Sequence, residues 1–253
     1  PTNYPEMELV WGDEFDQNQI NDTKWTFELG DGCPNLCGWG NNELQYYTDK
    51  PTNSFVASGY LVIEAKEEAF GGSDYTSARI ISENKQEFQF GRIDIRAKLP
   101  EGQGLWPALW MLGADFRDVG WPRCGEIDIM EFRGGKTDEY ITNFYYGTQP
   151  EVPLNDPRIT SYTFEAGEDL TSEFHIFDAV WSQNSIVFSL DGIEVRTISS
   201  TEFPYVSELF NKNQQVVLNT AVGGLIFEGV NLNLTNIPDK SYFIVDWVKI
   251  FKQ

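Results

Sequence analysis

The chain has 253 residues, of which 39 are acidic and 18 are basic, so its formal net charge is −21. Such a charge repels phosphate backbones and anionic lipid surfaces, which argues against nucleic-acid and membrane partners. No apolar run approaches the roughly 20 residues of a membrane-spanning helix. Residues 1–4 lack the basic and apolar character of a leader peptide. We therefore expect a mature, soluble chain.

The length fits one all-β domain spanning residues 1–253. Segments rich in β-branched and aromatic residues recur between clusters of Gly, Pro, Asn and Asp, and no long helix is predicted. We expect strands at residues 60–65, 78–81, 88–99, 126–131, 140–146, 177–181, 186–190, 215–222 and 242–251. Residues 149–169 are predicted to form a long surface loop.

Two patterns indicate how the strands pair. Residues 90–99 alternate apolar and polar side chains, as in a strand with one buried face. The dipeptide Asp191-Gly192 lies between two apolar runs and predicts a two-residue hairpin. Short strands joined by such turns predict a sandwich of two packed antiparallel sheets.

The few thiol and imidazole groups limit the metal chemistry. Cys33 and Cys37 are spaced to close a small loop by a disulfide, which leaves Cys124 free and is compatible with an oxidising compartment. A zinc site needs about four ligands, and scattered cysteines with the single His175 do not indicate one. We interpret His175 as a structural residue.

The predicted strand 126–131 contains three acids, Glu126, Asp128 and Glu131. In a chain this acidic, their spacing alone is expected by chance. The acids interleave with apolar residues, however, which indicates a well-buried strand where ionised carboxylates are costly to keep. This cost indicates a functional cluster, and the alternative is a solvated acidic edge strand.

In a regular strand, successive side chains point to opposite faces, so Glu131 would point away from Glu126 and Asp128. One extra residue in a β-bulge at Ile129-Met130 would return Glu131 to their face, and we predict this bulge. Glu126 and Glu131 could then flank a sugar bond at about 5–5.5 Å, the separation in retaining glycosidases. Glu126 would be the nucleophile and Glu131 the acid and then the base. Asp128 would share a proton with Glu126.

Six further motifs follow one another along the chain: WGDEF (11–15), WGNNELQYY (39–47), YTSARI (75–80), GLWPALWML (104–112), LNTAVGG (218–224) and VDWVKI (245–250). Together with EIDIME (126–131), they resemble glycoside hydrolase family 16, and within it the laminarinase-like endo-β-1,3-glucanases. The resemblance covers nearly the whole chain. It implies a β-jelly-roll with a concave, substrate-binding sheet, the same roles for the three acids, and no cofactor for catalysis.

The resemblance also implies a set of substrate-binding residues. Flat rings stack on the C–H faces of sugars, which we expect of Trp106, Trp110 and Trp121, although one of the first two is equally well explained as a core residue. The polar side chains expected to bond sugar hydroxyls are Asn41, Glu43, Arg79 and Asn219. Arg79 has the alternative role of an ordinary ion-pair partner.

Some members of the family bind a structural calcium. The matching positions in this chain are Glu14, the carbonyl of Gly59 and Asp246. Oxygen ligands and a high negative charge suit such a hard cation. The alternative is an N-terminal strand that holds no ion.

One departure from the family leaves the substrate open. Laminarinases usually carry a His fourteen residues after the acid/base, where this chain has Tyr145. A phenol keeps a hydrogen-bonding tip but does not titrate near pH 7 as imidazole does. We count Tyr145 among the substrate-binding residues. The first expectation is β-1,3-glucan, and the alternatives are mixed-linkage β-1,3-1,4-glucan or galactose-containing glycans of the agar, carrageenan or N-acetyllactosamine type.

The resemblance further implies a secreted protein, extracellular, on the cell surface or in a periplasm, that meets its polysaccharide as a monomer. A rival of a different class is an inactive, lectin-like jelly roll that only binds glycans. The three intact acids, Glu126, Asp128 and Glu131, argue against this rival.

Overall fold

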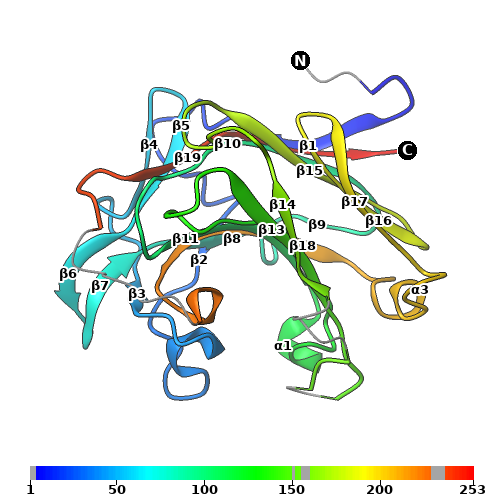
Figure 1. Cartoon of the computed structure of the whole chain (residues 1–253), viewed down its shortest axis with the longest axis horizontal. Coiled ribbons are helices and arrows are strands. Elements are labelled where there is room, and N and C mark those ends of the chain that lie inside the picture. Colours follow the sequence, from blue (N-terminus) through cyan, green and yellow to red (C-terminus); the bar gives the residue numbers. More distant parts are fainter. Residues whose placement is uncertain (1–3, 150–151, 155–159, 229–236) are drawn as a thin grey trace.

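The computed structural model describes residues 4–149, 152–154, 160–228 and 237–253. Apart from one small sheet and a few short helical turns, these residues form two antiparallel β-sheets stacked face to face (Figure 1). We call them sheet A and sheet B. The predicted all-β sandwich is confirmed.

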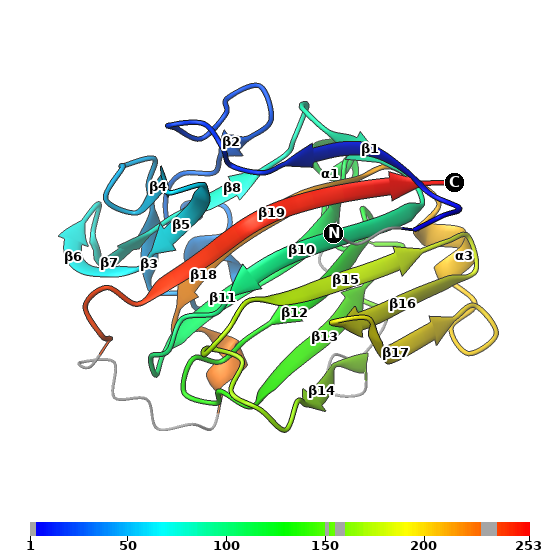
Figure 2. The ribbon, with the colours of Figure 1, turned by 90° about the horizontal axis from the view of Figure 1, so that it is seen from above.

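Sheet A contains both the first and the last strand. Its order is β17 (Ile193–Ser199), β16 (Ser185–Leu190), β15 (His175–Trp181), β10 (Gly91–Lys98), β19 (Tyr242–Lys252), β5 (Tyr60–Glu64) and β4 (Ser54–Ala57). The strand β1 (Glu8–Asp13) also pairs with β19, so these two strands lie side by side (Figure 2).

Sheet B is the second layer. Its order is β14 (Tyr162–Glu165), β13 (Glu139–Tyr145), β12 (Glu126–Glu131), β11 (Leu105–Gly113), β18 (Gln214–Val222), β8 (Arg79–Ile81) and β2 (Thr26–Phe27), and β9 (Glu87–Phe88) also pairs with β18. The acidic strand β12 therefore lies inside the sheet, between β11 and β13. The alternative of a solvated edge strand is wrong.

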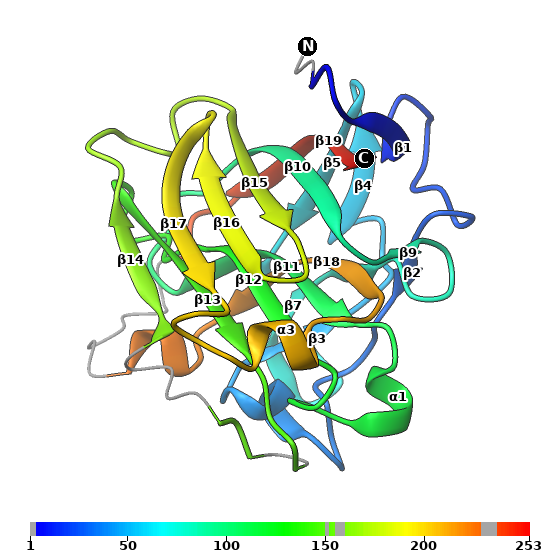
Figure 3. The same ribbon diagram turned by 90° about the vertical axis from the view of Figure 1, so that its right-hand side faces the viewer.

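The remaining elements are small. A third sheet joins β3 (Gln45–Tyr47), β7 (Ser73–Ser77) and β6 (Lys66–Phe70). The described helical turns are η1 (Cys37–Gly40), α1 (Phe116–Val119), α3 (Val206–Leu209) and η2 (Leu225–Phe227). The segments η1, η2 and α1 project from the side of sheet B that faces away from sheet A (Figures 1 and 3). No helix among the described residues has the length and apolar character that crossing a membrane requires.

The core lies between the two sheets because each presents one apolar face. From β10, Ile93, Ile95 and Ala97 are at most 1% exposed, and from β11, Leu109 and Met111 are fully buried in the same cluster. Burying an aliphatic side chain of this size contributes about 1.5–3 kcal/mol. The core fixes which face of sheet B is inward and leaves the outer face of sheet B for other side chains.

Strands occur at all nine predicted positions, with small shifts at their ends. The segment predicted as one strand at 88–99 is divided, because Phe90 has a left-handed φ of 56° between β9 and β10. The strand β11 was not predicted. It is buried on both faces, so it shows no alternation, and it contains Pro107, which lacks an N–H.

The prediction of one long loop at 149–169 is wrong in part. Residues 150–151 and 155–159 lie outside the described residues, but β14 occupies Tyr162–Glu165 within the predicted loop. The strand is only four residues long, and three of its side chains are exposed, so its short alternation of aromatic and polar residues was a weak signal. The predicted hairpin at Asp191-Gly192 is present between β16 and β17.

The cysteines and the histidine have structural partners or are buried. Cys33 and Cys37 form a disulfide just before and within η1, and Cys124 is a buried free thiol. His175 is 5% exposed, and its Nδ1 lies 2.7 Å from a carboxylate oxygen of Asp191 in the β16–β17 turn. This contact supports the structural interpretation of His175.

Candidate active site

The β-bulge predicted in β12 is present. Against β11, Leu109 pairs with Met130 and Trp110 pairs with Asp128, so Ile129 is the extra residue. The register with β13 also shifts in the segment that follows Asp128. Two residues of β12 therefore occupy the space of one on each neighbouring strand.

The bulge decides which way the last acid points. Both Ile129 and Met130 are buried in the inter-sheet core. Two successive side chains thus face inward, and the alternation resumes with Glu131 on the outer face of sheet B. Glu126 and Asp128 are on the same face, so the structure brings the three predicted acids together.

The three acids differ in exposure and in hydrogen bonding. Asp128 is 4% exposed, whereas Glu126 and Glu131 are half-buried. The indole Nε1 of Trp121 donates a hydrogen bond of 3.0 Å to Glu126. The Oδ2 of Asp128 is buried and has no hydrogen-bond partner in the described part of the chain. This orphaned oxygen is available for a proton or a ligand group.

Burial raises the pKa of Glu126, Asp128 and Glu131 above the usual carboxyl range. Beyond burial, the charge of Glu131 raises the pKa of Glu126, and both glutamates raise the pKa of Asp128. Three interacting carboxyls titrate as a unit, and the cluster therefore keeps part of its protons near neutral pH.

Different neighbours distinguish the two glutamates. After the opposing effects of burial and Glu131, the guanidinium of Arg79 lowers the pKa of Glu126 and favours its carboxylate form. After burial, the indole of Trp106 lowers the pKa of Glu131, and the carboxylate of Glu43 raises it. Arg79 therefore only partly offsets the effects of burial and Glu131 on Glu126, whose pKa is raised to about 8, against about 7 for Glu131.

Glu43 is held by three donors. Asn41 donates to one carboxylate oxygen at 3.2 Å, and Gln45 and the hydroxyl of Tyr47 donate to the other at 2.7 and 3.2 Å. Burial raises the pKa of Glu43, and these hydrogen bonds act in the opposite direction. The carboxylate is thus fixed in orientation beside the acid cluster.

A second set of contacts extends this network along sheet B. Asn219 donates to the hydroxyl of Tyr47 at 3.0 Å and accepts a hydrogen bond of 2.8 Å from the indole of Trp110. Across the sheet, Ala108 pairs with Glu131 on one side and with Asn219 on the other. Only a methyl group stands between Glu131 and Asn219 on this row of the outer face.

Arg79 is surrounded by partners. Its Nε lies 2.7 Å from Glu28, and its guanidinium carbon lies 4.8 and 4.6 Å from the ring centroids of Trp39 and Trp110. Glu28 also binds Arg117 of α1 at 2.8 Å. These contacts favour the interpretation of Arg79 as an ion-pair partner, and they make it a fixed cation near Glu126.

Trp121 and Tyr145 lie together beside Glu126, at the opposite end of the acid cluster from Glu131. Their ring centroids are 5.5 Å apart, and Tyr145 pairs directly with Glu126 across β12 and β13. Burial and the nearby carboxyls raise the pKa of Tyr145, so its phenol stays protonated. The half-buried ring of Trp121 is positioned beside Glu126 through its hydrogen bond.

Trp106 is more enclosed than the other two tryptophans. It is 9% exposed and packs with Ala221 and Phe227 in a small apolar cluster that includes η2. Its Nε1 makes no hydrogen bond of good geometry among the described residues. Of the two alternatives for Trp106, the structure favours a core residue with an edge toward Glu131.

With this geometry in place, the chain can be compared with known proteins. The family model of Glycosyl hydrolases family 16 matches residues 38–227, a range that includes β12 and most of sheet B. The chain belongs to glycosyl hydrolase family 16. The predicted family is confirmed.

Two relatives of this family 16 chain are named glucan endo-1,3-beta-glucosidases. It is 35% identical to the glucan endo-1,3-beta-glucosidase of Cryptopygus antarcticus, over 95% of the chain and 90% of that protein. It is 32% identical to glucan endo-1,3-beta-glucosidase A1 of Niallia circulans over 98% of the chain, but spans only 38% of that protein. The solved laminarinase catalytic domain of Thermotoga maritima is 36% identical, with a TM-score of 0.83 and 98% of both chains covered. The sandwich is thus the jelly roll of this family.

The three positions predicted to bind calcium in this family 16 chain lie near β19. Glu14 follows β1, Gly59 lies in the turn before β5, and both strands pair with β19, which contains Asp246. However, Glu14 pairs with Lys249 at 2.9 Å, and Asp246 pairs with Arg96. The described residues contain no group of three or more His, Cys, Asp or Glu side chains that could hold a metal ion. The arrangement does not fit calcium unless both cations move aside.

Sequence reasoning missed several residues of the family 16 site. Trp39, Gln45 and Tyr47 contact predicted residues, and all three lie in the motif WGNNELQYY that signalled this region. Their roles depend on contacts with β8 and β18, which the motif itself does not reveal. Glu28 has no local signal, because its importance comes from the ion pair with Arg79.

The buried Asp128 generates a prediction about stability. Because its pKa is raised on folding, the folded chain holds a proton that the unfolded chain releases near pH 4, and stability falls as pH rises from there through the folded pKa. The limiting slope is about 1.4 kcal/mol per pH unit for each proton. We predict that Asp128→Asn, which cannot ionise, raises the melting temperature by several degrees at pH 8 and by much less at pH 4. Scanning calorimetry checks this, with Asp49→Asn on the surface as control. Equal shifts at both pH values would contradict it.

Proposed function

We propose that this chain is a retaining endo-glycoside hydrolase that cleaves internal bonds of β-1,3-glucan. The observation that carries the proposal is the bulge in β12, which puts Glu126 and Glu131 on one face with Asp128 between them. The names of the two relatives, both glucan endo-1,3-beta-glucosidases, support β-1,3-glucan as the substrate.

In the proposed mechanism, the carboxylate of Glu126 attacks the anomeric carbon while Glu131 donates its proton to the oxygen of the leaving sugar. The result is a glycosyl ester on Glu126. Glu131 then removes a proton from water, and the water oxygen attacks the anomeric carbon and releases Glu126. Two inversions leave the product with its original β configuration.

Some neighbours of the two glutamates act in the direction of these roles. Glu126 must be ionised to attack, and Arg79 and the N–H of Trp121 favour its carboxylate form, although burial and the charge of Glu131 still raise its pKa to about 8. Glu131 must hold a proton, and the nearby carboxylate of Glu43 favours the protonated form. Asp128, whose pKa is raised well above its usual range, supplies a proton that it can share with Glu126.

We propose that the outer face of sheet B binds the polysaccharide chain around these acids. In this proposal Asn41, Glu43, Trp110, Trp121, Tyr145 and Asn219 contact the substrate, while Arg79 as an ion-pair partner and Trp106 as a core residue support the site. Many of them are linked by hydrogen bonds or ring contacts before substrate arrives. Such preorganisation lowers the entropy lost on binding.

We further propose that residues 1–253 form one catalytic domain, which is monomeric, secreted and needs no cofactor for catalysis. The disulfide between Cys33 and Cys37 supports an oxidising compartment. The proposed double displacement needs only carboxyl groups and water. A structural calcium near Glu14 and Asp246 also belongs to the proposal, on the condition that Lys249 and Arg96 release these two carboxylates when the ion binds.

The mechanism predicts both the product and the effect of removing each acid. We expect laminarin to yield short oligosaccharides that first appear as the β anomer in proton NMR spectra. Glu131→Gln should lower kcat/KM by about 10²–10⁴-fold, as loss of a general acid does, and Glu126→Gln should abolish the covalent step. Glu8→Gln at the exposed start of β1, in sheet A, is the matched control. An α anomer as first product would exclude the assigned roles.

Substitutions at Tyr145 test which residue at this position determines the choice of substrate. Tyr145 pairs with Glu126, at the position where laminarinases usually carry histidine. We expect Tyr145→His to raise kcat/KM on laminarin relative to mixed-linkage β-glucan by several-fold, and Tyr145→Phe to show what the hydroxyl alone contributes. A panel of laminarin, mixed-linkage glucan and galactose-containing glycans measures this. Fastest cleavage of a galactan by the unchanged chain would favour the alternative substrate class.

Calcium binding predicts a metal-dependent melting temperature. A ligand at 100 times its Kd adds about 2.7 kcal/mol to the free energy of unfolding, which corresponds to several degrees for a chain of this size. We therefore expect Ca²⁺ to raise the melting temperature over that in EDTA, and Glu14→Gln to reduce the difference. Identical melting curves in Ca²⁺ and EDTA would remove calcium from the proposal.

A further inference from the structure

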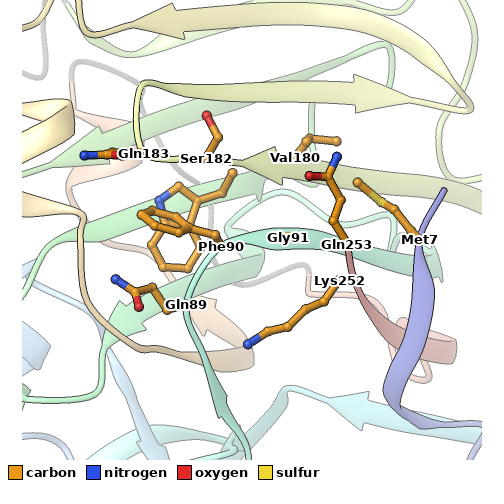
Figure 4. Close-up of a pocket in the computed structure, with 10 residues that line it drawn as sticks. Met7, Gln89, Phe90, Gly91, Val180, Ser182, Gln183, Lys252 and Gln253 are labelled. Atoms are coloured by element: carbon orange, nitrogen blue, oxygen red, sulfur yellow. The ribbon is translucent and has the colours of Figure 1, made fainter.

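A hollow of about 310 Å³ lies at one end of sheet A, away from the acids of sheet B (Figure 4). We call it the end pocket. Its walls come from the segment before β1, the start of β10, and the ends of β15 and β19. Ligand pockets commonly measure about 300–1,000 Å³, so the end pocket has room for a small ligand.

The backbone holds an aromatic ring in the end pocket. Phe90 and Gly91 have left-handed φ values of 56° and 122°. A Cβ at Gly91 would lie 2.3 Å from the carbonyl oxygen of Phe251, so only glycine fits there. The left-handed conformation of a bulky aromatic residue costs about 1–3 kcal/mol, and such strain is often found at ligand sites. Phe90 is half-buried, with its ring centroid 5.1 Å from that of Trp181.

The polar groups around Phe90 are mostly neutral. Gln183 and Ser182 lie on one side of the ring in Figure 4, and Gln253 and Lys252 on others. Amides donate and accept hydrogen bonds, as vicinal sugar hydroxyls do. Among the described residues, no Asp or Glu side chain lines the end pocket, although the chain carries 39 acidic residues. The lining thus combines an apolar ring with neutral hydrogen-bonding groups.

A buried donor adds a second observation. Trp181 lines the end pocket and is 1% exposed, and its Nε1 has no hydrogen-bond partner among the described residues. A buried N–H without an acceptor costs about 1–3 kcal/mol. Because this N–H is buried, an oxygen of water or of a bound hydroxylated molecule reaches it only if the wall of the end pocket shifts.

We propose that the end pocket is a second binding site for the polysaccharide, separate from the acids. Aromatic faces and neutral amides are the chemistry that recognises an uncharged sugar, with one apolar face and several hydroxyls. The proposal rests on the proposed function in one respect, namely that the substrate is a polymer. The two sites lie on different sheets with the core between them, so occupancy of the end pocket leaves the acids open.

A second site on the same polymer acts by avidity. Once one site is engaged, the other binds at a high effective concentration, which strengthens attachment to long or insoluble chains. A short oligosaccharide cannot reach both sites and gains nothing. The end pocket therefore affects binding of the polymer and leaves turnover of short substrates unchanged.

The test uses two variants and a matched control. Phe90→Gly removes the ring and suits the left-handed φ, and Gln183→Ala removes an exposed amide. Gln17→Ala, an exposed glutamine after β1, is the control. Each is combined with Glu131→Gln, and retention on insoluble β-1,3-glucan is measured by sedimentation. We expect at least about threefold weaker retention for both pocket variants. The control should be retained as strongly as the unchanged chain.

In the background with Glu131 intact, kcat/KM on a short oligosaccharide should stay within about twofold for both variants. Unchanged retention of both pocket variants would overturn the proposal. So would a parallel loss of retention and of short-substrate turnover, because it would indicate damage to the fold. If the unchanged chain cleaves another polymer of the panel, that polymer replaces the glucan. If it cleaves none, the proposed function fails, while retention on the panel still tests the end pocket.

Discussion

Side chains alternate along a β-strand, and the whole site depends on how β12 departs from that rule. A regular strand would direct Glu131 between the sheets, where a carboxylate without partners is costly. The extra residue Ile129 instead lets two apolar side chains in succession enter the core. The same dipeptide therefore serves the packing of the sandwich and the orientation of the last acid, and neither can be altered alone.

The second constraint is the cost of gathering acids on a partly buried face. The structure offsets this cost locally with a few fixed partners. Arg79 is placed by two indole rings and by Glu28, while Glu43 is placed by three donors of its own. Because these partners are themselves immobile, the acids have different surroundings before any substrate arrives, and two chemically identical glutamates can take different roles.

Much of this arrangement could be predicted from the sequence because local pattern carries it. The acids and the bulge followed from the apolar residues that β12 needs for its core face. The strand β11 could not be recognised in this way, because it is buried on both faces and contains Pro107. The strand β14 could not be recognised for a different reason, because it is short and its side chains are largely exposed.

Contacts between distant segments were beyond the sequence for a different reason. The role of Glu28 exists only through Arg79, and Tyr47 joins Glu43 of its own motif to the distant Asn219. No periodicity marks such pairs, because each residue looks ordinary in its own segment. The calcium positions show the converse. Their approach to β19 was implied by family resemblance, but the ion pairs of Glu14 and Asp246 were not.

The pair of Arg79 and Glu28 has a consequence for the response of the chain to salt. At 0.15 M ionic strength, exposed charges are screened beyond about 8 Å. The repulsion among the surplus negative charges is therefore weak in concentrated salt and stronger in dilute buffer. Arg79 and Glu28 are in direct contact, and their side chains are 10% and 9% exposed, so mobile ions hardly reach between them. The contact that holds Arg79 is thus insulated from the medium, while the solubility and self-repulsion of the whole molecule vary with it.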